Sequence, residues 1–353
     1  FGVQTINSVV VNYCIDGGDT VSRRWTGTLV GGDTTVFTGG TGVTLEAGFH
    51  NLVAWTSDTL TVGTALIRDH EPLNNASNVN NPDDVSFIVC TGPMSGVVNV
   101  GGENADYNNM YEFLLTLSRC GVDDSLVVKL CSDSVYGPFE MPAVFGTTEE
   151  HYVWFEPSGE RVKFVSDGGA TPYIANMAEA SNVHLRNIDF VRRSGALTNM
   201  VVLGINSNDC HFEGCTFTDS ASSATSAIEA MIASDHANNV YVKGCTVKGG
   251  NKGVDISGRT LELRSTGATV ERCYFSGQDT SAVQVQYMDN VSVQKNEMYD
   301  VASNTSYVLM ANGCYGNVRI MANKIYTTHG AGELGVGKLF GTQSNRAIVA
   351  NNM

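Results

Sequence analysis

Cys210-His-Phe-Glu-Gly-Cys-Thr-Phe217 is one copy of an eight-residue pattern that decides the fold. The form is apolar-x-apolar-x-x-[Ile/Cys/Asn]-x-apolar, and six more copies start at Val183, Val240, Ala268, Val291, Val318 and Arg346, the last of which breaks the first position. The sixth position falls at Ile188, Cys215, Cys245, Cys273, Asn296, Asn323 and Asn351. The spacing of these residues drifts between 23 and 30, which is typical of a solenoid.

Each copy alternates apolar and polar residues, which predicts strands rather than helices. Two residues separate the alternating runs and predict a tight turn, often with glycine, as at Gly214 and Gly244. A second apolar run follows in most repeats, for example Gly253-Val-Asp-Ile256. Several short strands in each coil, with coil stacked on coil, predict a right-handed parallel β-helix.

Stacked coils lie about 4.8 Å apart, so equivalent side chains touch. The sequence therefore predicts a column of cysteine thiols at Cys215, Cys245 and Cys273, because free Cys packs as a small hydrophobe. The amides of Asn296, Asn323 and Asn351 continue this column as a hydrogen-bonded ladder. Two positions further on, we expect a buried apolar column of Phe190, Phe217, Val247, Phe275, Met298, Ile325 and Met353.

One outward row reads Arg186, Glu213, Lys243, Glu271, Gln294 and Met321. Its first four members alternate in sign, which suits close neighbours on adjacent strands. We interpret this row as a solvated wall with weak ion pairs.

Residues 1–80 predict an antiparallel β-sandwich. Turn signals such as Asp16-Gly-Gly-Asp19 separate short runs at 9–13, 24–29, 34–37, 43–45, 50–56 and 65–67, and this spacing is typical of such folds. Trp25 and Trp55 are expected to anchor its core. The polar stretch 69–86 reads as a linker.

Residues 81–353 form the predicted β-helix, with a cap at 87–150 and regular coils at 151–353. In the cap, Asp106 is the predicted N-cap of a helix. Met110, Phe113, Leu114 and Leu117 then form one apolar stripe, and Gly121 ends the helix. We expect the stripe to cover the open end of the first coil and to hide strand edges.

Two resemblances rest on specific segments. Val11–Gly18, Trp25–Leu29 and Ala47–Ser57 resemble the immunoglobulin-like modules of large secreted Bacteroidetes proteins, which implies a spacer or adhesion unit. Gly101–Tyr107, Cys120–Val122, Leu126–Val128 and Phe139–Pro142 resemble the start of the pectin-lyase-like β-helix of the same surface proteins. This second resemblance implies an architecture rather than an activity, because one solenoid hosts lyases, hydrolases, esterases and adhesins.

Composition limits the partners and the location. The chain has 353 residues and a formal net charge of −15, which disfavours nucleic acid and anionic membranes. Charged residues make up only 16%, and this favours an extracellular or cell-surface β-protein. The sequence starts at Phe1 without an initiator Met or a signal peptide and stops at Met353 within a coil pattern, so we expect a piece of a longer polypeptide.

Nine cysteines leave at least one without an intrachain partner. A bridge among Cys90, Cys120 and Cys131 is one option that the sequence leaves open. The absence of a CxxC motif argues against a zinc ribbon.

No catalytic, cofactor or metal site is predicted. His184 and His211 occupy the same outward position on neighbouring coils, but two ligands make an incomplete metal site. Arg192 and Arg193 form the one basic pair, which we interpret as a surface feature. Asp69, Glu71, Asp83 and Asp84 leave a Ca²⁺ site open. The seventh position, which begins with Asp189 and includes Glu297, does not gather the carboxylates that a glycosidase needs.

The function expected from these patterns is that of a non-enzymatic structural or adhesive segment that contacts glycans or another surface component. The first alternative is a polysaccharide lyase or glycoside hydrolase, which requires two carboxylates and a Lys or Arg in one groove. Loops at 219–227 and 330–337 are the expected carriers of any such function. The second alternative, a phage tail spike, predicts a trimer.

Overall fold

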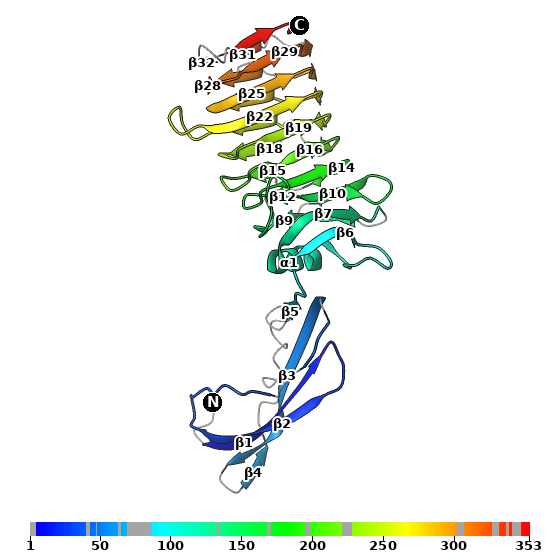
Figure 1. Cartoon of the computed structure of the whole chain (residues 1–353), viewed down its shortest axis with the longest axis vertical. Coiled ribbons are helices and arrows are strands. Elements are labelled where there is room, and N and C mark those ends of the chain that lie inside the picture. Colours follow the sequence, from blue (N-terminus) through cyan, green and yellow to red (C-terminus); the bar gives the residue numbers. More distant parts are fainter. Residues whose placement is uncertain are drawn as a thin grey trace. The chain divides into compact units, whose positions relative to one another are not determined.

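The computed structural model describes residues 5–39, 43–46, 48–62, 65–68, 86–132, 135–167, 171–194, 198–220, 228–301, 307–326, 332–336, 339–340 and 347–353. The chain divides into two compact units, Phe1–Gly92 and Pro93–Met353. We call them the N-terminal unit and the β-helix unit and describe each by itself (Figure 1). Within the described ranges, no helix is long and apolar enough to cross a membrane.

The N-terminal unit contains one antiparallel sheet in the order β2-β1-β3-β4, with β5 also paired to β3. The predicted strands at 34–37 and 43–45 are wrong, because these residues have no strand pairing. The turn at Asp16 and Gly17 is confirmed, and both residues have positive φ, of 53° and 69°. The strands are β1 (Ile6–Ile15), β2 (Val21–Leu29), β3 (Gly48–Val62), β4 (Ala65–Arg68) and β5 (Ser86–Val89).

Burial in this unit is shallow. Ser8 and His50 are the only buried side chains among its described residues, and Trp25 and Trp55 are half-buried. A sandwich requires two sheets that face each other, whereas the described strands form one. The all-β character is therefore established here.

The β-helix unit consists of three parallel sheets, which we call sheets I, II and III (Figure 1). Sheet I contains twelve strands, and sheets II and III contain eight stacked strands each. The predicted parallel β-helix is thus confirmed. Sheet I contains β6 (Met94–Val100), β7 (Val122–Leu130), β10 (Val153–Pro157), β13 (Val183–Arg186), β16 (His211–Glu213), β19 (Val240–Lys243), β22 (Ser265–Glu271), β25 (Met288–Gln294), β28 (Cys314–Tyr315), β29 (Arg319–Met321), β32 (Leu339–Phe340) and β33 (Ile348–Ala350).

The second strand of each coil belongs to sheet II, and the third strand belongs to sheet III. Sheet II contains β8 (Val135–Tyr136), β11 (Val162–Asp167), β14 (Ile188–Ser194), β17 (Thr216–Asp219), β20 (Thr246–Lys248), β23 (Tyr274–Ser276), β26 (Glu297–Tyr299) and β30 (Lys324–Tyr326). Sheet III contains β9 (Phe139–Glu140), β12 (Ala175–Asn176), β15 (Asn199–Leu203), β18 (Ala230–Asp235), β21 (Lys252–Ser257), β24 (Ser281–Gln286), β27 (Tyr307–Asn312) and β31 (Gly332–Val336). The prediction of a loop over 330–337 is wrong for β31, which stacks on β27.

The fifth position of the repeat turns the chain from sheet I to sheet II. Its backbone is left-handed in every copy, at Asn187, Gly214, Gly244, Arg272, Lys295, Ala322 and Asn351, with φ between 52° and 62°. This conformation favours glycine and asparagine. The predicted turn therefore has one conserved geometry along the solenoid, although four different residue types besides glycine occupy it.

The sixth position is a buried column of hydrogen-bond donors. The thiols of Cys215, Cys245 and Cys273 donate to the carbonyls of Leu185, Phe212 and Val242 on the preceding coil, at 3.3–3.4 Å. The Asn296 and Asn323 amides donate to the equivalent carbonyls of Val270 and Val293, both at 2.9 Å. Three cysteines are followed by asparagines at this position, and both residue types supply a short donor to the equivalent carbonyl.

The asparagines also bond one another. Asn296 Nδ2 and the Asn296 backbone N–H donate to Asn323 Oδ1, and the Cys273 N–H donates to Asn296 Oδ1. The predicted ladder is confirmed for these residues. The prediction of Asn351 as the last member of the ladder is wrong. Asn352 takes this place, because its Oδ1 atom accepts from Asn323 Nδ2 at 2.9 Å, whereas Asn351 is exposed.

The final copy is therefore displaced by one residue from the prediction. Arg319 pairs with Ile348 and Met321 with Ala350, so the copy begins at Ala347 rather than Arg346. Met353, predicted in the apolar column, is 74% exposed. The signal was present in the sequence, since Arg346 broke the first position and Ala347 satisfies it.

The remaining apolar column is confirmed in the core. Phe190, Phe217, Val247, Phe275, Met298 and Ile325 pair along sheet II and are buried. The rings of Phe190 and Phe217 stack at 5.0 Å and 3°. Such contacts add to the hydrophobic stabilisation that the buried area supplies.

Helix α1 (Met110–Cys120) covers the first coil, as its stripe predicted. Met110, Phe113, Leu114 and Leu117 are buried, and Phe113 meets Phe155 edge-on at 5.8 Å. The predicted N-cap is wrong. Asn109 caps the helix by accepting from the Glu112 N–H at 3.0 Å, while Asp106 accepts from Asn99 instead.

The cysteines divide into two groups. Cys90 and Cys120 are disulfide-bonded. Cys14, Cys131, Cys210, Cys215, Cys245, Cys273 and Cys314 are free thiols. Cys131 thus takes no part in the bridge that the sequence left open.

Candidate functional site

The outward charged row lies on sheet I in the predicted register. Arg186 pairs with Glu213 at 3.3 Å and with Glu156 at 3.8 Å, and Glu156 also pairs with Lys129. The Arg186 guanidinium lies 4.8 Å from the Trp154 ring centroid, in cation–π geometry. These charges partner one another on the surface as ion pairs, as the row's alternating signs predicted.

The basic pair Arg192 and Arg193 divides between two environments. Arg192 is buried and forms an ion pair with Asp219 at 3.1 Å. Arg193 is exposed and pairs with Asp167 at 3.6 Å. The interpretation of both as surface residues is wrong for Arg192, because adjacent residues of β14 point to opposite faces of the sheet.

His184 and His211 come together as the sequence predicted. Their rings stack at 3.9 Å and 7° on neighbouring coils. Tyr152 extends the stack on His184 at 4.7 Å, and Tyr241 meets His211 at 4.2 Å with a tilt of 52°. Four flat side chains therefore follow the solenoid axis on the outer face of sheet I.

A shallow groove of about 240 Å³ lies on this stack. Polar side chains form much of its wall: the carboxylates of Glu149 and Asp209, the amides of Asn182 and Asn239, and the Thr148 hydroxyl. We call it the sheet I groove, and its lining comprises Thr148, Glu149, Asn182, His184, Asp209, His211, Asn239 and Tyr241.

Hydrogen bonds fix part of this wall. Asn239 Nδ2 donates to Asp209 Oδ1 at 2.9 Å. The turn that carries Glu149 is closed by Thr148 Oγ1, which accepts from the His151 N–H at 3.0 Å. Asn182 is only 8% exposed, and its Oδ1 atom has no hydrogen-bond partner. An unpaired buried acceptor is costly, and a donor brought within reach of it from the groove would offset that cost.

Burial sets the protonation states in the groove. It lowers the pKa of His184 to about 3, with a contribution from His211, and it also lowers the pKa of His211. Burial raises the pKa of Tyr241, and the charges of Asp209 and Glu149 act in the same direction. Near pH 7 the imidazoles are therefore neutral, the phenol is protonated, and the fixed charge comes from carboxylates.

The described residues contain no group of three or more His, Cys, Asp or Glu side chains suited to a metal ion. At the seventh position, Asp189 pairs with Arg161 and Glu297 with Lys324. The candidate Ca²⁺ ligands Asp69, Glu71, Asp83 and Asp84 lie outside the described residues, as does most of the loop at 219–227.

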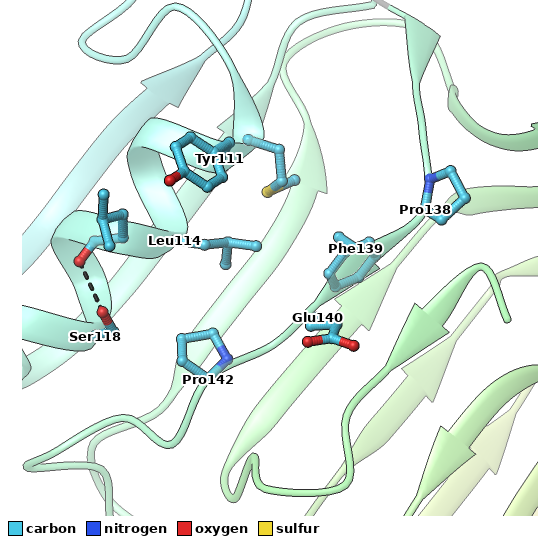
Figure 2. A pocket seen from close by; sticks show the side chains of 9 residues that line it. Tyr111, Leu114, Ser118, Pro138, Phe139, Glu140 and Pro142 are labelled. Carbon is cyan, nitrogen blue, oxygen red and sulfur yellow. Dashed lines mark hydrogen bonds between the residues drawn. The ribbon is translucent and has the colours of Figure 1, made fainter. Parts of the chain in front are cut away.

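A second hollow, of about 420 Å³, lies between α1 and the first coil (Figure 2). Tyr111, Leu114 and Ser118 line it from the helix, and Phe139 and Glu140 face them from β9. Ser118 Oγ donates to the Leu115 carbonyl at 2.8 Å and is therefore occupied within the helix. This hollow is apolar and offers few groups that would orient a ligand.

Comparisons with protein-family models and with curated proteins yielded no match to this chain. The class that the fold defines is a parallel β-helix protein. The sequence pattern identified His184 and His211 but missed the groove around them. Glu149 and Tyr152 lie outside the eight-residue copies, and only the register of β10 beside β13 brings that segment next to the histidines.

Proposed function

We propose that this chain is a non-enzymatic structural and adhesive segment of a large secreted or cell-surface bacterial protein, in which the β-helix presents a glycan-binding groove. The observation that carries the proposal is the lining of the sheet I groove, where flat rings lie beside amide, hydroxyl and carboxylate groups. Ring faces pack against the apolar faces of sugars, and the polar groups bond sugar hydroxyls.

The size of the groove favours binding of single sugar rings along a chain. Its volume of about 240 Å³ is smaller than the roughly 300–1,000 Å³ of sites that enclose a drug-sized ligand. Weak contacts of this kind gain strength when several copies or several sugars engage together. This suits an adhesin on a repetitive surface.

We also infer that the N-terminal unit is the immunoglobulin-like spacer that its sequence resembles. Its antiparallel sheet supports this assignment. The disulfide-bonded Cys90 and Cys120 support an extracellular location, because disulfides persist in oxidising compartments. Bacteroidetes origin remains part of the proposal.

The experiment incubates the purified chain with a panel of polysaccharides and follows both binding and turnover. We expect retardation in affinity gels without new reducing ends or unsaturated uronic products. Tyr241→Ala should abolish the retardation. Tyr326→Ala is the matched control, because Tyr326 is a 50% exposed tyrosine on sheet II outside the groove. Turnover of any polysaccharide by the unmodified chain would overturn the proposal.

A glycoside hydrolase is the second candidate, because Glu149 and Asp209 both line the groove and glycosidases use two carboxylates. A lyase is less favoured, since no Lys or Arg belongs to the described lining. For a hydrolase, Glu149→Gln and Asp209→Asn would each remove turnover but keep binding.

A further inference from the structure

The sheet I groove carries a charge that restricts its ligand. Glu149 and Asp209 are its only charged members among the described lining residues. The histidines add no positive charge near neutral pH, because burial lowers the pKa of both His184 and His211. The cations nearest in sequence are Arg186 and Lys243. Arg186 is engaged by Glu156, Glu213 and the Trp154 ring, and Lys243 lies between Glu213 and Glu271 in the register of sheet I.

The wall also has an excess of hydrogen-bond acceptors. Asn182 Oδ1 is buried without a donor, and the carboxylates of Asp209 and Glu149 accept only. The Asn239 amide is already used, since Nδ2 donates to Asp209 Oδ1. A ligand that supplies donors satisfies this wall, whereas a ligand carboxylate or sulfate adds repulsion.

Tyr241 supplies the surface on which a ring can lie. It is tilted by 52° against His211, so the two rings do not cover each other face to face. Its neighbour on the next coil is Thr269, a small residue that leaves room above the phenol. Asp209 and Glu149 lie near enough to Tyr241 to raise the pKa of its hydroxyl, so the ring platform and the carboxylates belong to one site.

We propose that the sheet I groove recognises an amino sugar with a free, protonated amine, stacked on Tyr241 with its ammonium group beside Asp209 and Glu149. The proposal rests on the glycan-binding function above and specifies its ligand class. The pyranose face meets the phenol, while the ammonium and hydroxyl groups donate to Asp209, Glu149 and Asn182 Oδ1. A cation over a tyrosine ring is also attractive in itself.

The experiment measures binding of the full chain to three oligosaccharides of equal length by calorimetry at pH 6.5. One carries free amines (glucosamine units), one is N-acetylated, and one is a uronate (galacturonic acid units). We expect the free-amine oligomer to bind roughly fivefold more tightly than the N-acetylated one at low salt, since a partly exposed ion pair contributes up to about 1 kcal/mol. The uronate should bind least, and the advantage of the amine should shrink as salt is raised.

Variants test the assigned residues. Asp209→Asn keeps Oδ1 for Asn239 and should reduce the preference for the amine severalfold, and Glu149→Gln should act in the same direction. Glu150→Gln is the matched control, because Glu150 is the exposed next residue and does not line the groove. A near-ultraviolet circular dichroism spectrum verifies that each variant is folded.

The outcomes separate the two proposals. Equal affinity for the amine and its N-acetyl form, or tightest binding of the uronate, overturns the amino-sugar inference and leaves glycan binding intact. An amine preference that survives in Asp209→Asn and Glu149→Gln also overturns it. Failure to bind any saccharide overturns both. Spermidine, an amine without a ring, should not compete, and effective competition would contradict the role of Tyr241.

Discussion

The two units of this chain differ in how often each contact is repeated. In the β-helix unit, equivalent positions on neighbouring coils lie in contact and can carry the same residue type. Phe190 thus stacks on Phe217, and Asn296 forms a hydrogen bond with Asn323. In the N-terminal unit, each pair occurs once, as with Asp16 and His50. The repeated unit buries nearly every inward side chain, whereas the described part of the other unit buries two.

This difference teaches that a solenoid can accommodate different residue types at one repeat position if each of them makes the same hydrogen bond or packing contact. Cysteine and asparagine share the sixth position because both donate to a carbonyl of the preceding coil. A single antiparallel sheet has no such equivalence along the chain. Its stability depends on individual contacts, each of them partly exposed to water. Four predictions test this contrast.

The largest effect is expected at the buried ion pair. Arg192→Met should destabilise the β-helix unit by about 3–5 kcal/mol, because it leaves the Asp219 carboxylate buried beside an apolar side chain. Arg193→Met is the adjacent control and should cost under about 1 kcal/mol, since Arg193 is exposed. Urea unfolding with hydrogen exchange resolved by segment gives both values.

The Asp16–His50 pair of the N-terminal unit provides a comparison with the buried Arg192–Asp219 pair. Asp16→Asn removes an ion pair with His50 that is 2.6 Å long but half exposed. Its effect should stay close to that of Arg193→Met. A loss at Asp16 as large as at Arg192 would contradict the contrast between the units.

The second effect concerns the donor column. Asn296→Ala leaves the Cys273 N–H without its acceptor and removes the side-chain donor to the Val270 carbonyl and to Asn323 Oδ1, which keeps the Asn296 backbone N–H. Each unpaired buried group costs about 1–3 kcal/mol, so we expect a loss of at least about 2 kcal/mol in thermal or urea unfolding. Asn296→Cys is the control, because cysteine performs the same donation on three earlier coils. Its loss should be clearly smaller, and an equal loss would refute the shared task.

The third effect is a pH dependence of opposite sign in the two units. Burial lowers the pKa of His184 to about 3, so the unfolded chain takes up a proton as pH falls below about 6.5 and the folded unit does not. The β-helix unit should therefore lose about 1 kcal/mol of stability between pH 7.5 and 5.5. His184→Gln should reduce this dependence, and the remainder should come from His211, whose pKa burial also lowers.

His50 behaves in the other direction. Its hydrogen bond with Asp16 raises its pKa, so its contribution is fully present below about pH 6.5 and is lost as pH rises through the raised value. Hydrogen exchange at the two pH values separates the units. Destabilisation of both units by the same acid shift would contradict the assignment.

The smallest effect is a gain. Ala322 is exposed and held at a φ of 55°, which strains any residue with a Cβ atom. Ala322→Gly should therefore stabilise the β-helix unit by about 0.5 kcal/mol, after the greater entropy of the unfolded glycine is included. Ala268→Gly is the control, because Ala268 is buried in a regular strand, and it should destabilise. A loss at both positions would show that the left-handed turn carries no strain.

Much of the fold followed from the sequence because one rule recurs on every coil. The alternation predicted sheets I and II, and the stripe from Met110 to Leu117 predicted the cap. The last coil was assigned one residue too early because Asn351 and Asn352 both offer an amide at the sixth position. The first position, which Arg346 breaks and Ala347 satisfies, was the signal for the register that β33 adopts. The N-cap of α1 was predicted wrongly for a similar reason, since Asp106 and Asn109 are both residue types that favour this position.

The site was less predictable. The pattern placed His184 above His211, because register alone determines that contact. It did not predict the groove, which depends on the path of the Thr148 turn and on the tilt of the Tyr241 ring. Neither feature repeats along the chain, so no periodic signal reports it. The burial of Arg192 could have been predicted from the alternation of inward and outward residues along the strand. It was missed because Arg192 and Arg193 were treated together as one basic pair.

The thiol column has a consequence for the reactivity of the cysteines toward oxidants. Cys215, Cys245 and Cys273 are each about 1% exposed, and their thiol protons are held by backbone carbonyls. Burial and the adjacent thiols raise the pKa of Cys245, which disfavours the reactive thiolate. Folding of the β-helix thus protects these three thiols from oxidation. In the unfolded chain, all three are exposed to oxidants. Alkylation of these three cysteines would accordingly count the molecules whose coils have not formed.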